Sequence, residues 1–532
     1  MLITFRQSMT WLHTWCGLVF GWLLFAIFVS GTLAVFRYEI DYWMMPELHV
    51  PMESGDLVAV GQRTLQSLAP GAARWLIELP ADRAPVLRLR WQQGPKDRLK
   101  SIYVDASGQQ LSPRETRGGS MIYRFHYGLL LGRAGIWIVG ALAMAMLIGL
   151  VSGVIIHADI FRDFFTFRPL RPAPRAWLDA HTVCGIAVLP FCLVITYSGL
   201  VIWWFIWMPG GIDLAFGGDQ AGFFRAASPR AVAQPITSSE PAAPTDMSRT
   251  LARLQDTAPD RPIVTDISVR APGTAAAKVE VSRMSQRVLW GESDRLSFDG
   301  VSGEIIERTP ERGRPAFVTH RVFRIIHEIK FADLGLRWIY FVMACVSSAV
   351  IATGTTLWGT KRRIKHFKAF AAAGASGRGV LVAFGVDAVN AGVIAGMATA
   401  LGAYFVANRL LPPLMPGRAD TEVTIFFVAW LGCIVVAVCL LAASRSRMTS
   451  VDGVQTALRR LWAILWGVAV GVAAAVAPLD EAMTRGISRA IRDGDAIVLS
   501  FHGVIIAVGA VMAWLFWMNL RRIPQRRGAG AR

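Results

Sequence analysis

Four histidines of this chain recur at matching positions in two similar segments, and a neutral histidine ring nitrogen is a good metal ligand. His13 opens the sequence HTWCG and His181 opens HTVCG, and a Ser-Gly pair lies 17 and 18 residues beyond each of them. His126 and His327 are each followed by a tryptophan after 11 residues and a glycine after 27 residues. The spacing indicates an internal duplication in which each copy carries two histidines.

The segments around these histidines are apolar enough to cross a membrane. The 532-residue chain is 54% hydrophobic and only 17% charged, which is too apolar for an ordinary water-soluble protein. A helix needs roughly 20 mostly apolar residues to span the hydrocarbon. The expected spans are residues 12–36, 128–156, 181–207, 332–358, 380–406, 423–443, 461–478 and 497–518. No cleavage-site pattern follows the first span, so we expect it to be retained.

The excess of positive charge predicts the orientation of the chain. Lysine and arginine exceed aspartate and glutamate by 18 charges, and many of these basic residues lie in the short connections on one side of the expected spans. Such connections normally face the cytoplasm. We therefore expect both termini to be cytoplasmic, and we expect a lipid bilayer, not nucleic acid, to account for the charge.

The expected fold class is an all-α polytopic membrane protein of about eight spans with two α+β domains outside the cytoplasmic membrane. Residues 101–111 and 295–306 each predict a strand, an aspartate-led turn and a second strand. The last four spans are expected to form a separate embedded unit. The expected parts are a first span at 1–36, an external domain at 37–125, a second span at 126–157, a basic loop at 158–180, a third span at 181–207, a second external domain at 208–326, a fourth span at 327–358, a basic loop at 359–379, four additional spans within 380–520 and a basic tail at 521–532.

The duplication predicts how the histidines pair. Both copies start and end on the same side of the membrane, so a pseudo-two-fold axis along the membrane normal should relate them. His13 would then face His181 near the cytoplasmic side, and His126 would face His327 near the external side. Two facing imidazoles can supply both axial ligands of a b-type haem. We therefore expect two haem b groups, one near each boundary, and hence a path for electrons across the bilayer.

Glycines one helical turn beyond two of the histidines fit this interpretation. Gly17 and Gly185 lie four residues after His13 and His181, on the same helix face. A residue without a side chain would let a flat porphyrin approach the backbone.

Two further histidines remain open as ligands. His157, which has no equivalent in the other copy, could replace His13 or His181, could help to hold a third cofactor, or could have an interface role. His320 lies seven residues before His327 on the same helix face and could compete with it. We favour His327 because it alone reproduces the tryptophan and glycine spacing.

Polar residues within the additional spans also allow two interpretations. Asp387 and Asn390 share a helix face, where they could serve a proton or quinol path or clamp two helices together. His502 has no repeat partner, and we expect it to be a packing residue.

The sequence resembles the PepSY-associated transmembrane family, which includes inner-membrane ferric-siderophore reductases of bacterial iron uptake. The resemblance covers about residues 1–368. The matching motifs are W-x-H-T-W-C-G-L at 11–18, S-G-T-L at 30–33, F-H-Y-G-L at 125–129, S-G-V-I-I-H at 152–157, F-F-T-F-R-P at 164–169, L-D-A-H at 178–181 and R-I-I-H at 324–327. The resemblance implies PepSY-like external domains, two b-type haems bound by the helix histidines, and reduction of ferric chelates in the periplasm. The additional spans depart from the shorter members of the family.

The expected function is therefore electron transfer through two haems to a periplasmic acceptor, namely the iron of a ferric siderophore, which would make the protein an oxidoreductase of the inner membrane. No residue stands out as a separate catalytic group. No dinucleotide-binding motif is present, so a membrane quinol or a cytoplasmic reductase is expected to donate the electrons. The alternatives are an envelope regulatory or interaction protein that uses the membrane part as an anchor, and a non-redox transporter.

Overall fold

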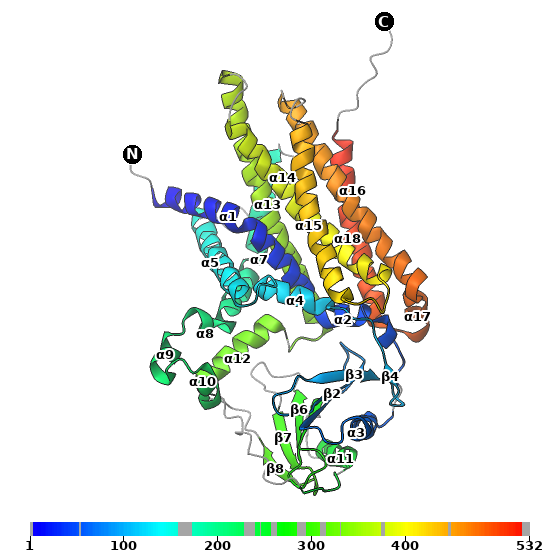
Figure 1. Cartoon of the computed structure of the whole chain (residues 1–532). Helices are drawn as coiled ribbons and strands as arrows, with labels where there is room; N and C mark the ends of the chain where they lie inside the picture. The colour runs from blue at the N-terminus through cyan, green and yellow to red at the C-terminus, as the bar shows by residue number, and fades with distance from the viewer. Residues whose placement is uncertain are drawn as a thin grey trace. The chain divides into compact units, whose positions relative to one another are not determined.

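The fold is known from a computed structural model (Figure 1). The residues that the structure describes are 4–52, 55–157, 173–227, 240–244, 246–256, 263–284, 294–308, 315–329, 331–373, 378–444, 448 and 450–523.

The chain divides into two compact units, and each is described by itself. The helical unit consists of Met1–Met44, Glu115–Tyr197 and Arg337–Arg532. The sheet unit consists of Met45–Arg114 and Ser198–Leu336.

Eight helices of the described chain are long and apolar enough to cross a membrane, which confirms the number expected from the sequence. Every one of them overlaps an expected span. They are α1 (Phe5–Ala34), α5 (Gly132–Ile156), α7 (Ala173–Ile202), α13 (Leu334–Ala373), α14 (Arg378–Leu410), α15 (Arg418–Ala443), α16 (Val451–Thr484) and α18 (Ala496–Arg521).

Two of the key histidines do not lie on these spanning helices, contrary to the expectation that His126 and His327 open spans. His126 lies on the short helix α4 (Gly118–Gly128), and His327 lies on α12 (Pro315–Glu328). Each short helix ends in a residue with positive φ, Leu129 at 50° and Ile329 at 56°. A helix cannot continue through this left-handed conformation, which is strained for a residue with a side chain. The chain therefore turns between each histidine helix and the span that follows.

The basic connections also differ in part from the expectation. Helix α13 continues to Ala373, through much of the segment 359–379 that was expected to be a loop, and its lysines and arginines are good helix formers. In the basic loop expected at 158–180, residues 158–172 lie outside the described residues, and so do residues 524–532 of the basic tail.

All eight described strands form one antiparallel sheet in the order β4-β3-β2-β1-β5-β6-β7-β8. Each expected external domain contributes four consecutive strands, and the two halves join where β1 pairs with β5. Ile77 lies opposite Ile267 at the middle of this junction. The strands are β1 (Arg74–Glu78), β2 (Leu87–Gln92), β3 (Lys100–Val104), β4 (Gln110–Leu111), β5 (Ile263–Arg270), β6 (Lys278–Met284), β7 (Asp294–Asp299) and β8 (Ile305–Arg308).

Both strand-turn-strand predictions are confirmed, because β3 pairs with β4 and β7 pairs with β8. Asp105 accepts hydrogen bonds from the hydroxyl and the backbone amide of Ser107, and Asp299 accepts one from the amide of Ser302. These bonds stabilise the charged carboxylates and lower the pKa of both aspartates.

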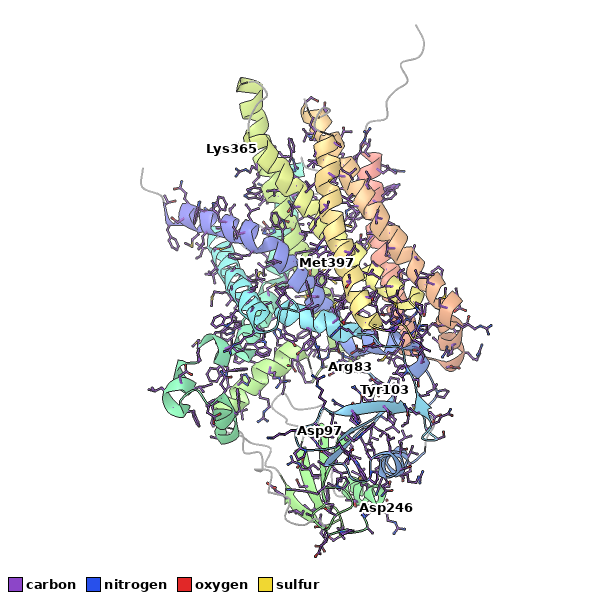
Figure 2. All side chains as sticks on the ribbon, viewed as in Figure 1. Arg83, Asp97, Tyr103, Asp246, Lys365 and Met397 are labelled. Atoms are coloured by element: carbon purple, nitrogen blue, oxygen red, sulfur yellow. The ribbon has the colours of Figure 1, made fainter. Side chains whose placement is uncertain are left out.

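The sheet buries one face and leaves the other polar, as the alternation of side chains along a strand requires. Trp75, Ile77 and Ile267 belong to a core that α3 (Leu57–Leu68) and α11 (Met247–Asp256) cover (Figure 1). On the opposite face the Arg88 guanidinium lies 5.3 Å from the centre of the Tyr103 ring, which Figure 2 labels on β3.

The four additional spans were expected to form a separate unit. Instead they belong to the same compact unit as α1 and α5. The reason is visible in α2 (Arg37–Trp43), whose Trp43 is 0% exposed. Its indole stacks on Phe501 of α18 at 4.0 Å, and Arg409 of α14 lies 3.7 Å from the ring centre. An aromatic side chain buried this deeply binds the two groups of helices together.

The shared sheet can be tested by disulfide formation across its junction. Leu76 of β1 and Ser268 of β5 are direct partners on one face, and partners in an antiparallel pair lie about 4.5–5.5 Å apart, within reach of a disulfide. The double variant Leu76→Cys with Ser268→Cys should cross-link efficiently, as measured by non-reducing gel mobility of protein cleaved between the two segments. The matched control pairs Leu76→Cys with Ser297→Cys, which lies in the same row but two strands further from β1. Equal cross-linking of both pairs would contradict the register.

Candidate functional site

His13 on α1 contacts three groups that lie within about one turn of α5. Its Nδ1 atom lies 2.9 Å from the carbonyl oxygen of Gly149 and 3.2 Å from the hydroxyl of Ser152. The ring edge rests on Gly153, where a Cβ would lie 3.3 Å from Cε1 of the ring. A side chain at this position would thus contact the imidazole closely, and a glycine lets the ring lie against the neighbouring helix without displacement.

His181 on α7 repeats this arrangement against α13. Its Nδ1 atom lies 2.9 Å from the carbonyl oxygen of Val350 and 3.4 Å from the hydroxyl of Thr353. A Cβ at Gly354 would lie 3.0 Å from Cε1 of the ring. In both copies the carbonyl comes four residues before the glycine and the hydroxyl comes one residue before it. We call this glycine, with its carbonyl and hydroxyl, an imidazole seat.

His126 has a seat on α1. Its Nδ1 atom lies 2.9 Å from the carbonyl oxygen of Ile27, and a Cβ at Gly31 would lie only 2.7 Å from Cε1 of the ring. The carbonyl again comes four residues before the glycine. Here the preceding Ser30 bonds to carbonyls of its own helix instead of the ring.

His327 lies on the equivalent glycine of the second copy, within the sheet unit. The hydroxyl of Ser198 lies 3.1 Å from its Nδ1 atom, and a Cβ at Gly199 would lie 2.9 Å from Cε1 of the ring. Each of the four predicted histidines therefore lies against a glycine. Two of these glycines, Gly31 and Gly199, belong to the Ser-Gly pairs that repeat in the sequence.

The seats determine which ring nitrogen is available. A backbone carbonyl can only accept a hydrogen bond, so the Nδ1 atoms of His13, His126 and His181 carry the proton, and the lone pair lies on Nε2. In the described part of the chain no hydrogen bond reaches the Nε2 atom of His13 or His181. A donated Nδ1 proton that leaves Nε2 as the ligand atom is the arrangement found around metal-binding histidines.

His13 and His181 are brought together as the duplication predicts. Their ring centres lie 6.2 Å apart, and the ring planes make an angle of 74°. An imidazole nitrogen binds a first-row metal at about 2 Å, so two rings on opposite sides of one ion have centres roughly 6 Å apart. The donor set and the spacing of this pair thus fit a metal ion that both imidazoles would bind.

The pairing of His126 with His327 remains a prediction, because His126 belongs to the helical unit and His327 to the sheet unit. The two histidines share a local feature, because each lies near the end of a short helix. His126 lies three residues before Leu129 and His327 lies two residues before Ile329, and both of these later residues have positive φ.

The two glycines chosen from the sequence lie in open surroundings. Nothing described lies within 4 Å of a Cβ built on Gly17, and one built on Gly185 meets only the Val350 side chain at 3.9 Å. A methyl group at either position would therefore have room, one turn beyond His13 and His181.

A model of the family described as the PepSY-associated TM region matches residues 10–361, more than half of the chain. The chain belongs to this family. No curated protein matches it. The matched region of this PepSY-associated protein contains all four seated histidines and their glycines, whereas α14 to α18 lie beyond it.

The two histidines left open as ligands, His157 and His320, are not among the side chains that a Cβ at any described glycine of this PepSY-associated protein would meet. The Nε2 atom of His320 lies 3.3 Å from the carbonyl oxygen of Ile202, so Nε2 carries the proton and the lone pair lies on Nδ1, the reverse of His13 and His181. His157 caps the end of α5 through its backbone amide and lies close enough to His13 and His181 to interact with them electrostatically. The choice of His327 over His320 as a ligand, and the role of His157, therefore remain predictions.

Two polar residues of α14, Asp387 and Asn390, bind neighbouring helices. Asn390 accepts a hydrogen bond from the Trp22 indole at 2.7 Å and donates one to the carbonyl of Thr355 at 3.1 Å. Asp387 pairs with Arg363. Asp387 and Asn390 thus join α14 to both α1 and α13.

His502 is a buried packing residue with a partner. Its Nε2 atom lies 2.7 Å from Oδ2 of Asp480. The other carboxylate oxygen of Asp480 accepts a hydrogen bond from Arg409 at 2.6 Å. The Trp43 ring packs edge-on against His502, with ring centres 5.9 Å apart. These contacts lie in the helical unit and help to bury Trp43.

What the sequence did not reveal is the use of the seat residues. The equal spacing of Gly153 and Gly354 was a signal, but only the fold shows that each glycine accommodates a ring. Ser152 and Thr353 could have been found by asking which hydroxyl residues precede these glycines.

Replacing the seat glycine Gly31 by alanine tests whether contact with the His126 ring, and not helix propensity alone, determines the effect on stability. In Gly31→Ala the new methyl group would overlap the His126 ring, so we expect the unfolding free energy to fall by about 1–3 kcal/mol. In Gly17→Ala the methyl meets open space, and alanine favours a helix over glycine by about 1 kcal/mol, so stability should be kept or raised. Thermal unfolding in detergent measures both. Equal stability of the two variants would contradict the seat.

Asp41 predicts a pH dependence for the helix that carries His126. It accepts hydrogen bonds from the amide and hydroxyl of Ser120 at 3.2 Å, at the first turn of α4. Burial nonetheless raises the pKa of Asp41 to about 6, whereas an unfolded aspartate titrates near 3.9. The folded state therefore binds the proton more tightly, so this contribution to stability is present below about pH 4 and is lost as the pH rises through about 6.

The corresponding test compares wild type with Asp41→Asn. Raising the pH from 4 to 7 should lower the thermal midpoint of wild type more than that of the variant, because the amide stays neutral. Other titrating groups are common to both proteins. Parallel pH profiles would show that Asp41 does not titrate in this range.

Proposed function

We propose that this PepSY-associated membrane protein carries electrons across a bacterial inner membrane and reduces the iron of a ferric siderophore. The observation that supports the proposal best is the seated pair His13 and His181, with both Nδ1 atoms bound to carbonyls and ring centres 6.2 Å apart. A ring pair held in this way suits two axial ligands of one b-type haem.

The chain's own residues would do most of the positioning. His13 and His181 would hold one haem and His126 and His327 a second, and each seat keeps its ring from rotating. Gly17 and Gly185 would leave room for the macrocycle. When bound, such haems supply reversible one-electron chemistry, and the protein tunes it through axial ligation and burial.

The proposed orientation puts both termini in the cytoplasm and the eight-stranded sheet in the periplasm, following the positive-inside rule. The ferric chelate is the substrate, and reduction to Fe(II) would weaken its hold on hard oxygen ligands. A membrane quinol or a cytoplasmic reductase would supply the electrons.

Haem content tests the proposal directly. The purified protein should show low-spin haem bands that dithionite reduces, with two haem equivalents by pyridine haemochrome assay. His13→Ala and His126→Ala should each remove one equivalent, because each breaks a different pair. His320→Ala, the matched control, should retain both.

Gly17→Ala adds a discriminating variant. Because the fold accepts the methyl group, we expect this protein to be as stable as wild type but to lose the haem at His13 and His181. The absence of haem bands from the wild-type protein would refute the electron-transfer proposal. Bands that no ferric siderophore can reoxidise would refute only the proposed substrate.

A further inference from the structure

The helix that carries His126 is too short to hold its own position. Helix α4 has 11 residues, and isolated helices shorter than about 12–15 residues are marginal in water. Beyond its C-terminal end the chain takes the strained Leu129 and Leu130 conformations. The direction of the His126 ring must therefore depend on tertiary contacts along α4.

The N-terminal end of α4 is bound by a group of buried side chains from the additional spans. The Tyr404 hydroxyl donates to the carbonyl of Gly118 at 3.0 Å. Arg418 donates to the carbonyl of Glu115 at 3.0 Å. Glu422 accepts a hydrogen bond from the Thr116 hydroxyl at 2.5 Å. We call Tyr404, Arg418 and Glu422 the α4 clamp.

The clamp is buried and internally paired. Tyr404, Arg418 and Glu422 are each 0% exposed, and so is Asn408, which donates to Glu422 at 2.8 Å. Arg418 and Glu422 also pair with each other. Moving or removing one partner of a buried ion pair leaves the other charge unpaired, which is strongly unfavourable. The clamp groups, and the α4 backbone that they bind, are therefore restricted to a narrow range of positions.

A second set of contacts lies directly beside the histidine. Phe125 precedes His126, and its ring centre lies 5.9 Å from those of Phe426 and Trp430 on α15. On the other side, the first turn of α4 fits closely against α2, where a Cβ at Gly119 would lie 2.2 Å from the carbonyl oxygen of Arg37. In Figure 1, α4 and α2 lie beside the ends of the additional helices.

We propose that the additional spans serve to position His126: the α4 clamp fixes the register of α4 and so the direction in which His126 presents its Nε2 atom. This inference rests on the proposed function in one respect, namely that His126 is an axial ligand. Tyr404, Arg418 and Glu422 are positioning residues that act through α4 and the residues directly before it.

Two mild substitutions remove one clamp hydroxyl or its partner. Tyr404→Phe removes the hydroxyl that binds Gly118. Thr116→Val removes the hydroxyl that donates to Glu422 and also accepts from the Gly118 amide, while the side chain keeps nearly the same shape. Both should keep two haem equivalents but alter the haem that His126 holds, with an at least threefold change in its reduction equilibrium constant and a shifted low-spin electron paramagnetic resonance signal. The haem held by His13 and His181 should stay unchanged. His126→Ala identifies which signal belongs to which haem.

Two controls separate positioning from general loosening. Thr116→Ser keeps the hydroxyl and should restore the wild-type signal. Tyr42→Phe removes a hydroxyl that binds Asp495 of the additional spans at 3.0 Å, on α2 instead of α4, and should leave both haems unchanged. Hydrogen exchange of the haem-free protein provides a second readout, in which Tyr404→Phe should expose the amides of 118–128 selectively.

Three outcomes would overturn the inference. In the first, Tyr404→Phe and Thr116→Val both keep the wild-type potential and signal. In the second, Tyr42→Phe changes them as much as Tyr404→Phe does. In the third, exchange at 118–128 is the same in Tyr404→Phe and wild type. If the wild-type protein binds no haem, the proposed function fails as well, whereas normal haem content with an insensitive signal contradicts the clamp alone.

Discussion

The organisation of the helical unit depends on one local constraint: a buried imidazole must have its Nδ1 proton accepted by another group. The backbone carbonyl of a neighbouring helix accepts it for His13, His126 and His181, and a glycine four residues later lets the ring approach that helix. Both requirements act over one helical turn, so the carbonyl and the glycine come from the same face. The recurrence of this seat explains why the glycine spacing is duplicated along with the histidines.

The seat also explains why the two copies differ from simple pairs of spans. A ring can meet the carbonyl only if its own helix crosses the neighbour at a suitable position, and α4 and α12 are separated from the following spans by strained turns. Strain of this kind persists only where the surrounding structure enforces it. For α4 that surrounding structure includes buried groups of α14 and α15, which lie outside the region shared with the family.

The sheet unit shows the same duplication in another form. Each half supplies four strands and a covering helix, and β1 and β5 meet with Ile77 opposite Ile267. Half of the sheet alone would leave β1 as an exposed edge strand that could pair with other chains. Joining the halves pairs both inner strands and makes one continuous core beneath α3 and α11.

The sequence by itself determined the eight spans, the duplication, the four histidines and the two hairpins, because hydropathy, spacing and turn residues are properties of neighbouring positions along the chain. It predicted the meeting of His13 and His181 through symmetry, which the structure bears out. Only the tertiary structure decided which carbonyl holds each ring, that His126 and His327 lie on separate helices, that the two halves share a sheet, and that the additional spans hold α4. These features depend on contacts between distant residues, such as His126 with Ile27, 99 positions apart, and Thr116 with Glu422, 306 positions apart. No local pattern encodes such contacts, because they arise only when the packed helices meet.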